Sequence, residues 1–432
     1  MSYIPKMVAA LHTAVLIGIV LLAGCSKSTE VTFSQHIAPI LQAKCQTCHR
    51  PGQIAPMPFL TFRETRPFAE LIRLAVNQGS MPPFYADGPL GYYKDDIRLT
   101  AEEKQLINAW ADAGAPEGDP AYLPELIQWD PSGWPFGEPD FIVEFPRYSP
   151  RTDAVDDYIT FVTEPAFRDD LWVSALHLRF ETTNVVHHSS QLLWPPNMKV
   201  PEGGKTLDHP NQLLNPLFTW TPGFKTVRLP PGQALRLNAR HRIASTTHFA
   251  PTVKEISEKM QLGIYYANGE VHHLLKNIGA SIRSINIPPG DANWTASSKA
   301  TFKEDALISH FRVHMHLRGK SSRIVLHYPD GTSETVFDLP RFRFEWQRYY
   351  YLNEPKHVPK GTVAEFIGVW DNSSANPSNP DPTVWCRWGL KSTNEMFGSN
   401  IFYTSTRKLP VPVVIEKGLQ VGGPKLRNHQ LL

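Results

Sequence analysis

The sequence has little of what defines several common protein classes. It contains only four cysteines, so it lacks the cysteine pairs of a disulfide framework. Neither sign of charge predominates, because 43 lysines and arginines balance 41 aspartates and glutamates. This balance argues against nucleic acid as a partner. After the first 25 residues the hydrophobic runs are short and interrupted by many of the 39 prolines, which favours short strands over long helices.

The length exceeds what one hydrophobic core usually supports, so we expect several domains. After Asp140, short β-branched or aromatic segments alternate with Pro/Gly turns, a pattern typical of antiparallel sandwiches. The predicted fold class is a small all-α domain followed by two antiparallel β-sandwich (jelly-roll) domains. The expected divisions are an export signal (1–25), the helical domain (26–120), a linker (121–139), the two sandwiches (140–285 and 286–410) and a C-terminal tail (411–432).

The first 25 residues have the form of an export signal. Lys6 precedes an apolar stretch from Val8 to Leu22, and the segment ends in Leu-Ala-Gly-Cys at Cys25. This ending resembles a bacterial lipoprotein signal, in which Cys25 becomes the lipidated first residue of the mature chain. Ser26 then implies attachment to the outer membrane, facing the periplasm. An uncleaved anchor helix is the alternative, although its apolar run is short for a span of about 20 residues.

A CQTCH motif occupies residues 45–49. The thiols of Cys45 and Cys48 lie one helical turn apart and His49 follows at once, which is the pattern of covalent haem attachment. A redox or zinc motif is less well supported, because neither a thioredoxin-like strand nor a second ligand pair lies nearby. The motif therefore predicts a c-type haem with His49 as an axial ligand.

Two helices are expected around this motif. Apolar residues at helical spacing predict one over Phe33–Ala43. Thr100 and Glu103 form a capping box that predicts another over Ala101–Ala113.

The region of about residues 30 to 120 resembles a class I cytochrome c domain. In that family a methionine before prolines, as in Met81-Pro82-Pro83, is the second axial ligand of the haem. The resemblance therefore implies Met81 as this ligand, with Met57 as the rival sulfur. A His/Met pair raises the reduction potential and suits electron transfer.

Alternating residues in Ile308–Ser322 predict a strand with four polar residues on one face, namely His310, Arg312, His314 and His316. Two imidazoles two residues apart lie about 6.5 to 7 Å apart at Cα, close enough to bind one metal ion. His310 lies about 13 Å from His314 and is too far for the same ion. The alternative is an exposed strand whose polar residues face solvent.

Other residues offer the ligands that this pair lacks. His187 and His188 are adjacent, so joint ligation requires a bend or bulge, because neighbours in a flat strand face opposite sides. Either His241 or His248 would complete a three-imidazole site with them. Met396 precedes an apolar strand; a lone methionine there is ordinarily a core residue, but as a ligand its thioether would favour Cu(I).

These motifs, in this order, resemble a known family. The set comprises His187-His188, His241, His314-Met315-His316 and Glu395-Met396, within roughly residues 140 to 407. It is similar to the copper type II, ascorbate-dependent monooxygenases, the group that contains peptidylglycine and dopamine β-monooxygenases. The resemblance implies one copper bound by His187, His188 and His241, and a second, O₂-binding copper bound by His314, His316 and Met396. In this family the two sites face each other across solvent.

The chain departs from this family at two points. Eukaryotic members are disulfide-rich, whereas this chain has no spare cysteine pairs. Arg312 matches the arginine that binds the substrate carboxylate in peptidylglycine monooxygenase, but Asn400 stands where a tyrosine is expected. This departure argues against peptide amidation. Arg312 has the alternative of being a solvated strand residue.

Together these features predict a lipid-anchored periplasmic oxidoreductase. In this hypothesis a c-type haem passes electrons to two copper ions, and a substrate C–H bond is hydroxylated with O₂. The expected partners are a small-molecule substrate, O₂, a periplasmic electron donor and the membrane, which the lipid anchor contacts. The alternative is a non-catalytic copper-binding or electron-transfer lipoprotein, which would form no hydroxylated product.

Overall fold

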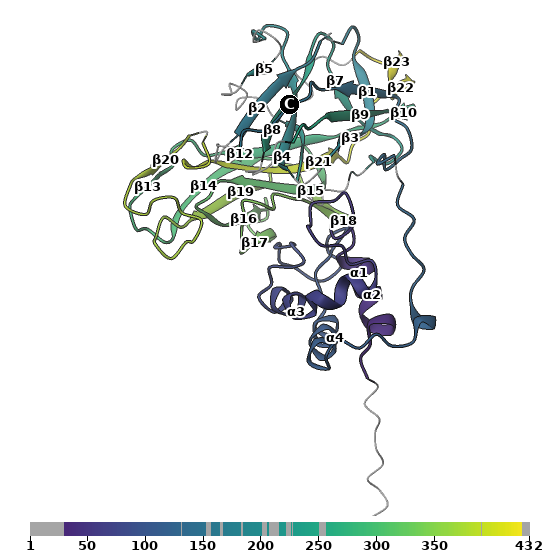
Figure 1. Ribbon diagram of the computed structural model, residues 1–432. Helices are drawn as coiled ribbons and strands as arrows, with labels where there is room; N and C mark the ends of the chain where they lie inside the picture. Colours follow the sequence, from purple (N-terminus) through teal and green to yellow (C-terminus); the bar gives the residue numbers. More distant parts are fainter. Residues whose placement is uncertain are drawn as a thin grey trace, which may run out of the picture.

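The structure is a computed structural model that describes residues 30–425 apart from short segments at 131, 153–156, 165–166, 183–184, 201–204, 207–215, 222–225, 227, 250–255 and 390. Cys25 and the rest of the predicted export signal lie outside the described residues. No helix in the described part of the chain is long and apolar enough to cross a membrane. Most regular structure is β-sheet and helices are few, as the composition predicted (Figure 1).

The helices are gathered in the N-terminal region (Figure 1). They are η1 (Phe33–Ile37), α1 (Ala38–Lys44), α2 (Phe62–Thr65), η2 (Arg66–Phe68), α3 (Ala69–Asn77), α4 (Ala101–Asp112) and η3 (Pro120–Tyr122). Phe33, Leu41 and Trp110 belong to the small core that they share. The predicted capping box is confirmed: the Thr100 hydroxyl accepts from the Glu103 backbone N–H, and the Glu103 carboxylate accepts from that of Thr100. Such a cap stabilises a helix by about 1 kcal/mol.

Two five-stranded sheets form the first sandwich. One has the order β5 (Lys205–Thr206), β2 (Asp157–Val162), β8 (Arg242–Phe249), β4 (Val186–Trp194) and β6 (Pro216–Trp220). The other has the order β1 (Phe141–Glu144), β9 (Met260–Tyr266), β3 (Leu171–Phe180), β7 (Gln233–Leu237) and β11 (His273–Leu274). Phe161 and Phe249 of the first sheet share a core with Leu178 and Leu262 of the second. Neighbouring strands are antiparallel except for β7 and β11, which are parallel.

Two four-stranded sheets form the second sandwich. One has the order β12 (Lys276–Ser281), β21 (Phe397–Ser405), β15 (Ala306–Met315) and β18 (Tyr349–Val358). The other has the order β14 (Trp294–Thr301), β19 (Val363–Trp370), β16 (Gly319–His327) and β17 (Ser333–Leu339). A short pair, β13 (Asn286–Ile287) and β20 (Cys386–Arg387), lies beside them. The strand predicted over Ile308–Ser322 is two strands, because the chain turns between Met315 and Gly319.

Two predicted domain boundaries differ from the structure. β12 falls within the predicted first sandwich, yet it pairs with β21 of the second. The predicted tail contains β22 (Val413–Glu416) and β23 (Leu419–Gly422), which form a three-stranded sheet with β10 (Gly269–Val271). Both differences arise from pairing between distant segments, which local composition does not report.

The chain between α3 and α4 packs against the second sandwich. Phe84 and Tyr93 belong to the same core as Phe311 of β15. The Phe84 ring lies 5.3 Å from that of Tyr350, at 90°, and Tyr93 forms a backbone bridge with Leu352 of β18. Figure 1 shows the helical region lying next to β18. The helical region and the second sandwich are therefore joined through a common core.

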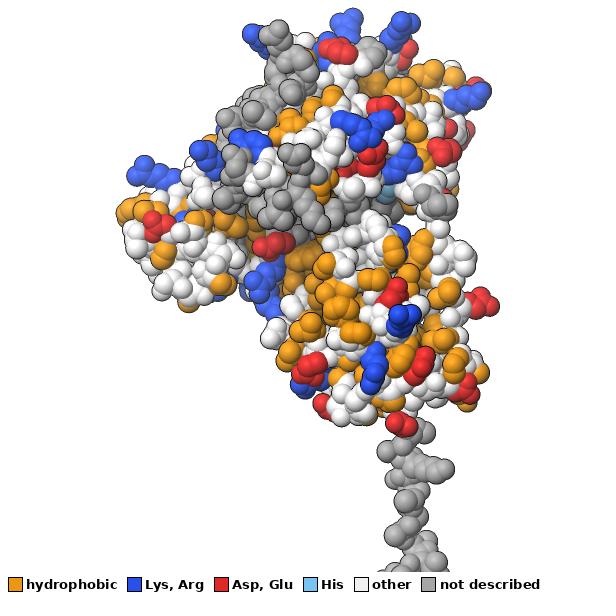
Figure 2. Space-filling model, in the orientation of Figure 1, with side chains coloured by type: hydrophobic (Ala, Val, Ile, Leu, Met, Phe, Trp, Pro, Cys, Tyr) orange, Lys and Arg blue, Asp and Glu red, His pale blue; other side chains and the backbone are white. Residues whose placement is uncertain are grey.

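The surface carries charges of both signs. On the face shown in Figure 2, acidic and basic side chains are interspersed, and hydrophobic side chains gather over the helical region. Exposed hydrophobic residues of that region include Leu71, Leu74, Met81 and Leu90. A gathering of exposed apolar side chains often marks a surface that a ligand or partner covers.

Candidate functional site

Three imidazoles converge at the side of the first sandwich that faces the second. His187 and His188 lie at the start of β4, and His248 lies near the end of the neighbouring β8. Their ligand nitrogens lie within 4.8 Å of one another. Nδ1 of His187 is 3.0 Å from Nδ1 of His188 and 3.0 Å from Nδ1 of His248. Because a tetrahedral ion with metal–nitrogen bonds of about 2.0 Å needs ligand nitrogens about 3.3 Å apart, this group fits one metal ion with a small adjustment.

A β-bulge brings the two adjacent histidines together. The register of β4 against β8 shifts between Val186 and His188, and His188 pairs directly with His248. Such a bulge bends the strand and lets consecutive side chains turn to one side. The structure thus contains the irregularity that joint ligation by His187 and His188 was predicted to require.

His241 lies away from this group. It precedes β8, and its Nδ1 donates to the carbonyl of Ala239 at 3.1 Å. Because a strand rises about 3.3 Å per residue, His241 is about 23 Å from His248 along β8. The imidazole that lies beside His187 and His188 is therefore His248, one of the two alternatives that the sequence left open, and not His241.

His314 lies at the end of β15 and His316 just beyond it, with ring centroids 5.1 Å apart. The Gln347 amide nitrogen donates to the Phe344 carbonyl at 2.9 Å, so the Gln347 amide oxygen accepts from Nδ1 of His314 at 2.5 Å. Nδ1 of His316 donates to the carbonyl of Asn394 at 3.3 Å. Both rings therefore have hydrogen on Nδ1 and a lone pair on Nε2. A histidine metal ligand is held in this way when its other nitrogen donates to the protein.

Met396 lies next to this pair. In the pairing of β15 with β21, Gly398 lies opposite His314 and Phe397 lies opposite Met315. His316 and Met396 are the next residues of the two segments. The fully buried carboxylate of Glu395 accepts hydrogen bonds from the backbone N–H of His316 at 3.0 Å and of Met396 at 3.2 Å. Burial raises the pKa of Glu395 to about 7. One carboxylate thus fixes the two backbone segments that position His316 and Met396.

The two groups of ligands lie against each other. The ring centroids of His188 and His314 are 6.3 Å apart, and the Phe344 ring is 4.9 Å from His187 and 6.0 Å from His316. Burial, followed by the charges of neighbouring histidines, holds the pKa of both His188 and His314 well below the usual range. Both rings are therefore neutral and able to donate a lone pair. Rings of both groups lie around that of Phe344.

Arg312 is buried beside these groups. Its exposed fraction is 7%, so the alternative of a solvated strand residue does not hold. The guanidinium carbon lies 5.9 Å from the centre of the Tyr349 ring, and its charge contributes to lowering the pKa of His188 and His314. Its Nε is buried and has no hydrogen-bond partner among the described residues. An anionic group on a ligand would satisfy such a nitrogen.

The CQTCH motif forms a helical turn after α1. The backbone N–H groups of Cys48 and His49 donate to the carbonyl of Cys45 at 3.1 and 3.0 Å. Nδ1 of His49 donates to the carbonyl of Met57 at 3.0 Å, and its ring stacks on Phe59 at 4.3 Å. This leaves Nε2 of His49 as the acceptor, which suits an axial ligand. The Met57 side chain packs against the helical core, as expected of a packing residue.

Met81 lies just after α3, before the segment that packs on the second sandwich. Its side chain is 37% exposed. Its backbone N–H donates to the carbonyl of Ala75 at 3.3 Å, and Arg341 of the second sandwich donates to the carbonyl of Gly79 at 3.1 Å. The backbone around Met81 is therefore anchored while its thioether is not packed in a core, which fits a ligand of a prosthetic group.

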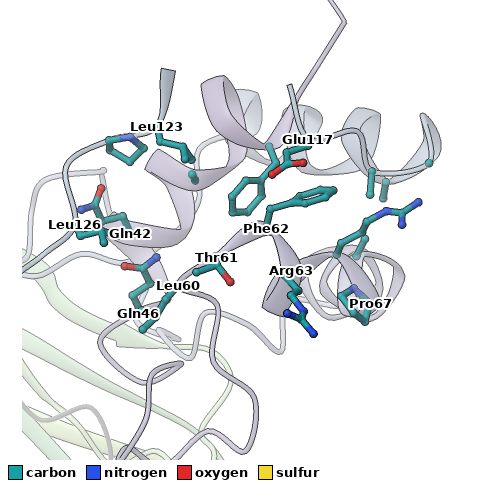
Figure 3. A pocket seen from close by; sticks show the side chains of 18 of the residues that line it. Gln42, Gln46, Leu60, Thr61, Phe62, Arg63, Pro67, Glu117, Leu123 and Leu126 are labelled. Atoms are coloured by element: carbon teal, nitrogen blue, oxygen red, sulfur yellow. The ribbon is translucent and has the colours of Figure 1, made fainter. Parts of the chain in front are cut away.

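A hollow of about 970 Å³ lies elsewhere in the helical region. Figure 3 shows Leu123 and Leu126, from the chain after α4, on one side of it and Phe62 and Arg63 of α2 on the other. Gln46 is the one member of the CQTCH motif among the described residues of its lining, and Met81 is not among them. We therefore do not assign this hollow to a haem.

Sequence reasoning missed the residues that hold the ligands in place. Gln347 and Phe344 stand in the chain before β18 without any motif, and no local pattern indicates them. Glu395 was noted only as the neighbour of Met396. His248, which the sequence offered as an alternative to His241, is the imidazole that lies beside His187 and His188.

Comparisons with known proteins do not assign the chain to a family. No family model matches the chain, and no curated protein matches it. Among solved structures, the VP2 subviral particle of infectious bursal disease virus is 10% identical, with 62% of this chain and 72% of that chain covered and a TM-score of 0.19. The major capsid protein P2 of bacteriophage PM2 is 6% identical, with 58% and 97% covered and a TM-score of 0.21. The STIV MCP is 9% identical, with 61% and 91% covered and a TM-score of 0.21. Scores this low support no argument about fold or function.

Proposed function

We propose that the protein is a copper-dependent monooxygenase that receives electrons through a c-type haem. One copper would be held by His187, His188 and His248, and the second by His314, His316 and Met396. The observation that supports this most is the convergence of two groups of imidazoles, only 6.3 Å apart between the His188 and His314 rings. Bound there, copper would supply one-electron redox chemistry and activation of O₂, which imidazole and thioether ligands suit.

The chain's own residues have distinct roles in this proposal. Gln347 and Asn394 accept the Nδ1 hydrogens of the second pair of imidazoles, so Nε2 of each ring is the nitrogen that would bind copper. Glu395 fixes the backbone on both sides of that site. The ring of Phe344 lies beside imidazoles of both groups.

Arg312 is proposed to bind an anionic group of the substrate. It is buried, its Nε lacks a hydrogen-bond partner among the described residues, and it lies on the face of β15 that presents His314. Asn400 lies directly opposite Arg312 in the pairing of β15 with β21 and offers an amide beside the guanidinium. The substrate class is therefore a small molecule with a carboxylate or similar anion near the C–H bond that is hydroxylated.

A haem c is proposed on Cys45 and Cys48, with His49 and Met81 as axial ligands. The carbonyl of Pro83, close to Met81, accepts from the Arg348 guanidinium at 3.4 Å. Arg348 is the neighbour of Gln347, which holds His314. This contact supports the proposal that the helical region serves as the electron donor of the second sandwich.

Three finer features belong to the same proposal. The helical region would have a class I cytochrome c fold, and both sandwiches would be jelly rolls. Cys25 would be lipidated and would attach the protein to the outer membrane on its periplasmic side. Replacing it, Cys25→Ser, should release the protein from the membrane fraction. Retention with an intact amino terminus would instead indicate an ordinary anchor.

Metal and haem analysis of the purified full-length protein tests the proposal first. We expect two copper ions and one covalent haem per chain, and an O₂-dependent hydroxylated product with an anionic substrate. Met81→Ala should remove the weak Met-to-iron charge-transfer band but leave the haem attached, whereas Met57→Ala should keep the band. Copper binding without any hydroxylated product would favour the alternative, a non-catalytic copper-binding or electron-transfer lipoprotein.

A further inference from the structure

A second cavity lies between the two sandwiches, apart from the convergent imidazoles. Its volume is about 170 Å³. Strands β3, β6 and β7 of the first sandwich and β15, β18 and β21 of the second contribute its lining. On β15 it is bordered by Ser309 and His310. Because a strand rises about 3.3 Å per residue, His310 is about 13 Å from His314, so the cavity is distinct from the proposed copper ligands.

His310 is a buried imidazole that the proposed function does not use. Its exposed fraction is 6%. Its ring stacks on Phe402 at 4.2 Å and 8°, and it lies 4.4 Å from the ring of Tyr351. Burial lowers the pKa of His310 to about 3, so the ring is neutral at ordinary pH. A neutral imidazole has one nitrogen that donates and one that accepts.

The hydrogen bonds of Ser309 decide which nitrogen accepts. The Ser309 hydroxyl donates its single hydrogen to the carbonyl of Phe402 at 3.1 Å. Its oxygen is also 2.8 Å from Nδ1 of His310, so it must accept there. His310 therefore has its hydrogen on Nδ1, and Nε2 has a lone pair. That nitrogen has no hydrogen-bond partner among the described residues, and the His310 side chain is part of the lining of the cavity.

The rest of the lining restricts the ligand further. Among the described residues of the lining, Lys94, from the helical region, has the one charged side chain, and it is exposed. Aromatic rings of Phe218, Tyr349, Tyr351 and Phe402 form much of the wall. A dry apolar cavity of about 150 Å³ binds benzene, so this cavity has room for one ring. Aromatic walls favour an aromatic ligand through edge and face contacts.

We propose that this cavity binds a single-ring aromatic compound with one O–H or N–H donor, such as a phenol, and that the donor hydrogen-bonds to Nε2 of His310. The site requires neither copper nor haem, so its test is independent of the proposed function.

Calorimetric titration of the full-length protein with phenol and with toluene tests this site, because the two ligands match in size and differ in the donor. Phenol should bind about tenfold more tightly than toluene. In His310→Phe the ring and its stacking remain but the acceptor is lost, so phenol should bind no better than toluene. Equal binding of both ligands to the native protein, no binding of either at millimolar concentration, or an unchanged phenol preference in this variant would overturn the proposal.

Two further variants keep the test decisive. Ser309→Ala removes the group that fixes the His310 tautomer, so binding of anisole, an acceptor, should rise relative to that of phenol. Leu275→Trp fills the cavity and should abolish binding of both phenol and toluene. Undiminished binding in Leu275→Trp would show that the ligands bind elsewhere. If that variant fails to fold, His310→Phe and Ser309→Ala still decide the question.

Discussion

The two groups of imidazoles differ in how their rings are held. In the first group, Nδ1 of His187 faces Nδ1 of both His188 and His248, so the nitrogens that would bind a metal face one another. In the second, the Nδ1 atoms of His314 and His316 donate outward to carbonyl oxygens. A bulge in the backbone shapes the first group, whereas surrounding side chains and carbonyls shape the second. The imidazoles of the second group are therefore oriented by hydrogen bonds to other parts of the protein, whereas those of the first group contact one another through Nδ1.

Removal of an imidazole from the first group should have the largest effect. His248→Ala should eliminate one of two copper equivalents, because two imidazoles rarely hold an ion in a protein without a third ligand. His241→Ala is the matched control and should retain both equivalents, since His241 is about 23 Å from the group along β8. Metal analysis after dialysis measures both. Loss of copper from His241→Ala alone would restore the prediction made from the sequence.

Replacement of the thioether should affect only the second group. Met396→His should leave Cu(II) bound but lower substrate hydroxylation by orders of magnitude, because a soft ligand stabilises the Cu(I) state that meets O₂. X-ray absorption of the reduced protein should show a Cu–S scattering path in the native protein and none in this variant. Met315→Leu is the control, since Met315 is fully buried in the core, and its Cu–S path should persist. Nitrogen and oxygen scatterers alone in the native protein would rule out Met396 as a ligand.

Loss of the outward hydrogen bond should weaken the second site by a moderate amount. Gln347→Leu removes the acceptor of the His314 Nδ1–H and should lower copper affinity there by about 10- to 100-fold, with the first site unchanged. A competition titration with a copper chelator measures both affinities. Gln191→Leu is a suitable control, because buried Gln191 bonds only to hydroxyls of Ser189 and Ser245 among the described residues. Equal weakening of both sites would show that the groups are not organised separately.

The smallest effect is expected at the residue that both groups share. Phe344→Leu should keep both copper equivalents and reduce the free energy of unfolding by about 1 kcal/mol, as a conservative core replacement does. Denaturant unfolding of the metal-free protein and copper analysis provide the two measurements. Loss of one copper ion would mean that the aromatic ring itself, and not only the ligands, determines the geometry of a site.

Local sequence patterns predicted some parts of the site and not others. The CQTCH motif and the Thr100 capping box depend on residues close in the chain, so spacing alone indicated them. The need for a bulge at His187-His188 also followed from strand geometry. The choice between His241 and His248 could not be made in this way, because it depends on the register of β4 against β8, which pairs residues about sixty positions apart.

Contacts between segments distant in sequence also explain why the supporting residues and two domain boundaries were missed. Gln347 becomes significant only because the chain before β18 passes beside the end of β15. β12 and the β22–β23 hairpin pair with strands far away in sequence, so their composition gave no indication of their sheet. Buried Arg312 was ambiguous for a related reason: alternation along β15 shows which face it shares with His314, but not that the first sandwich covers this face.

The contribution of Phe84 and Tyr93 to the core of the second sandwich also determines how the protein can be divided. A mobile carrier domain on a flexible tether can be cut away without harm to its neighbour. Here a deletion of residues 30–120 would remove the rings of Phe84 and Tyr93 from the core of the second sandwich and leave a cavity there. Part of the helical region thus completes the hydrophobic core of the second sandwich. Its exchange for another small domain would succeed only if the segment from Phe84 to Tyr93 were retained.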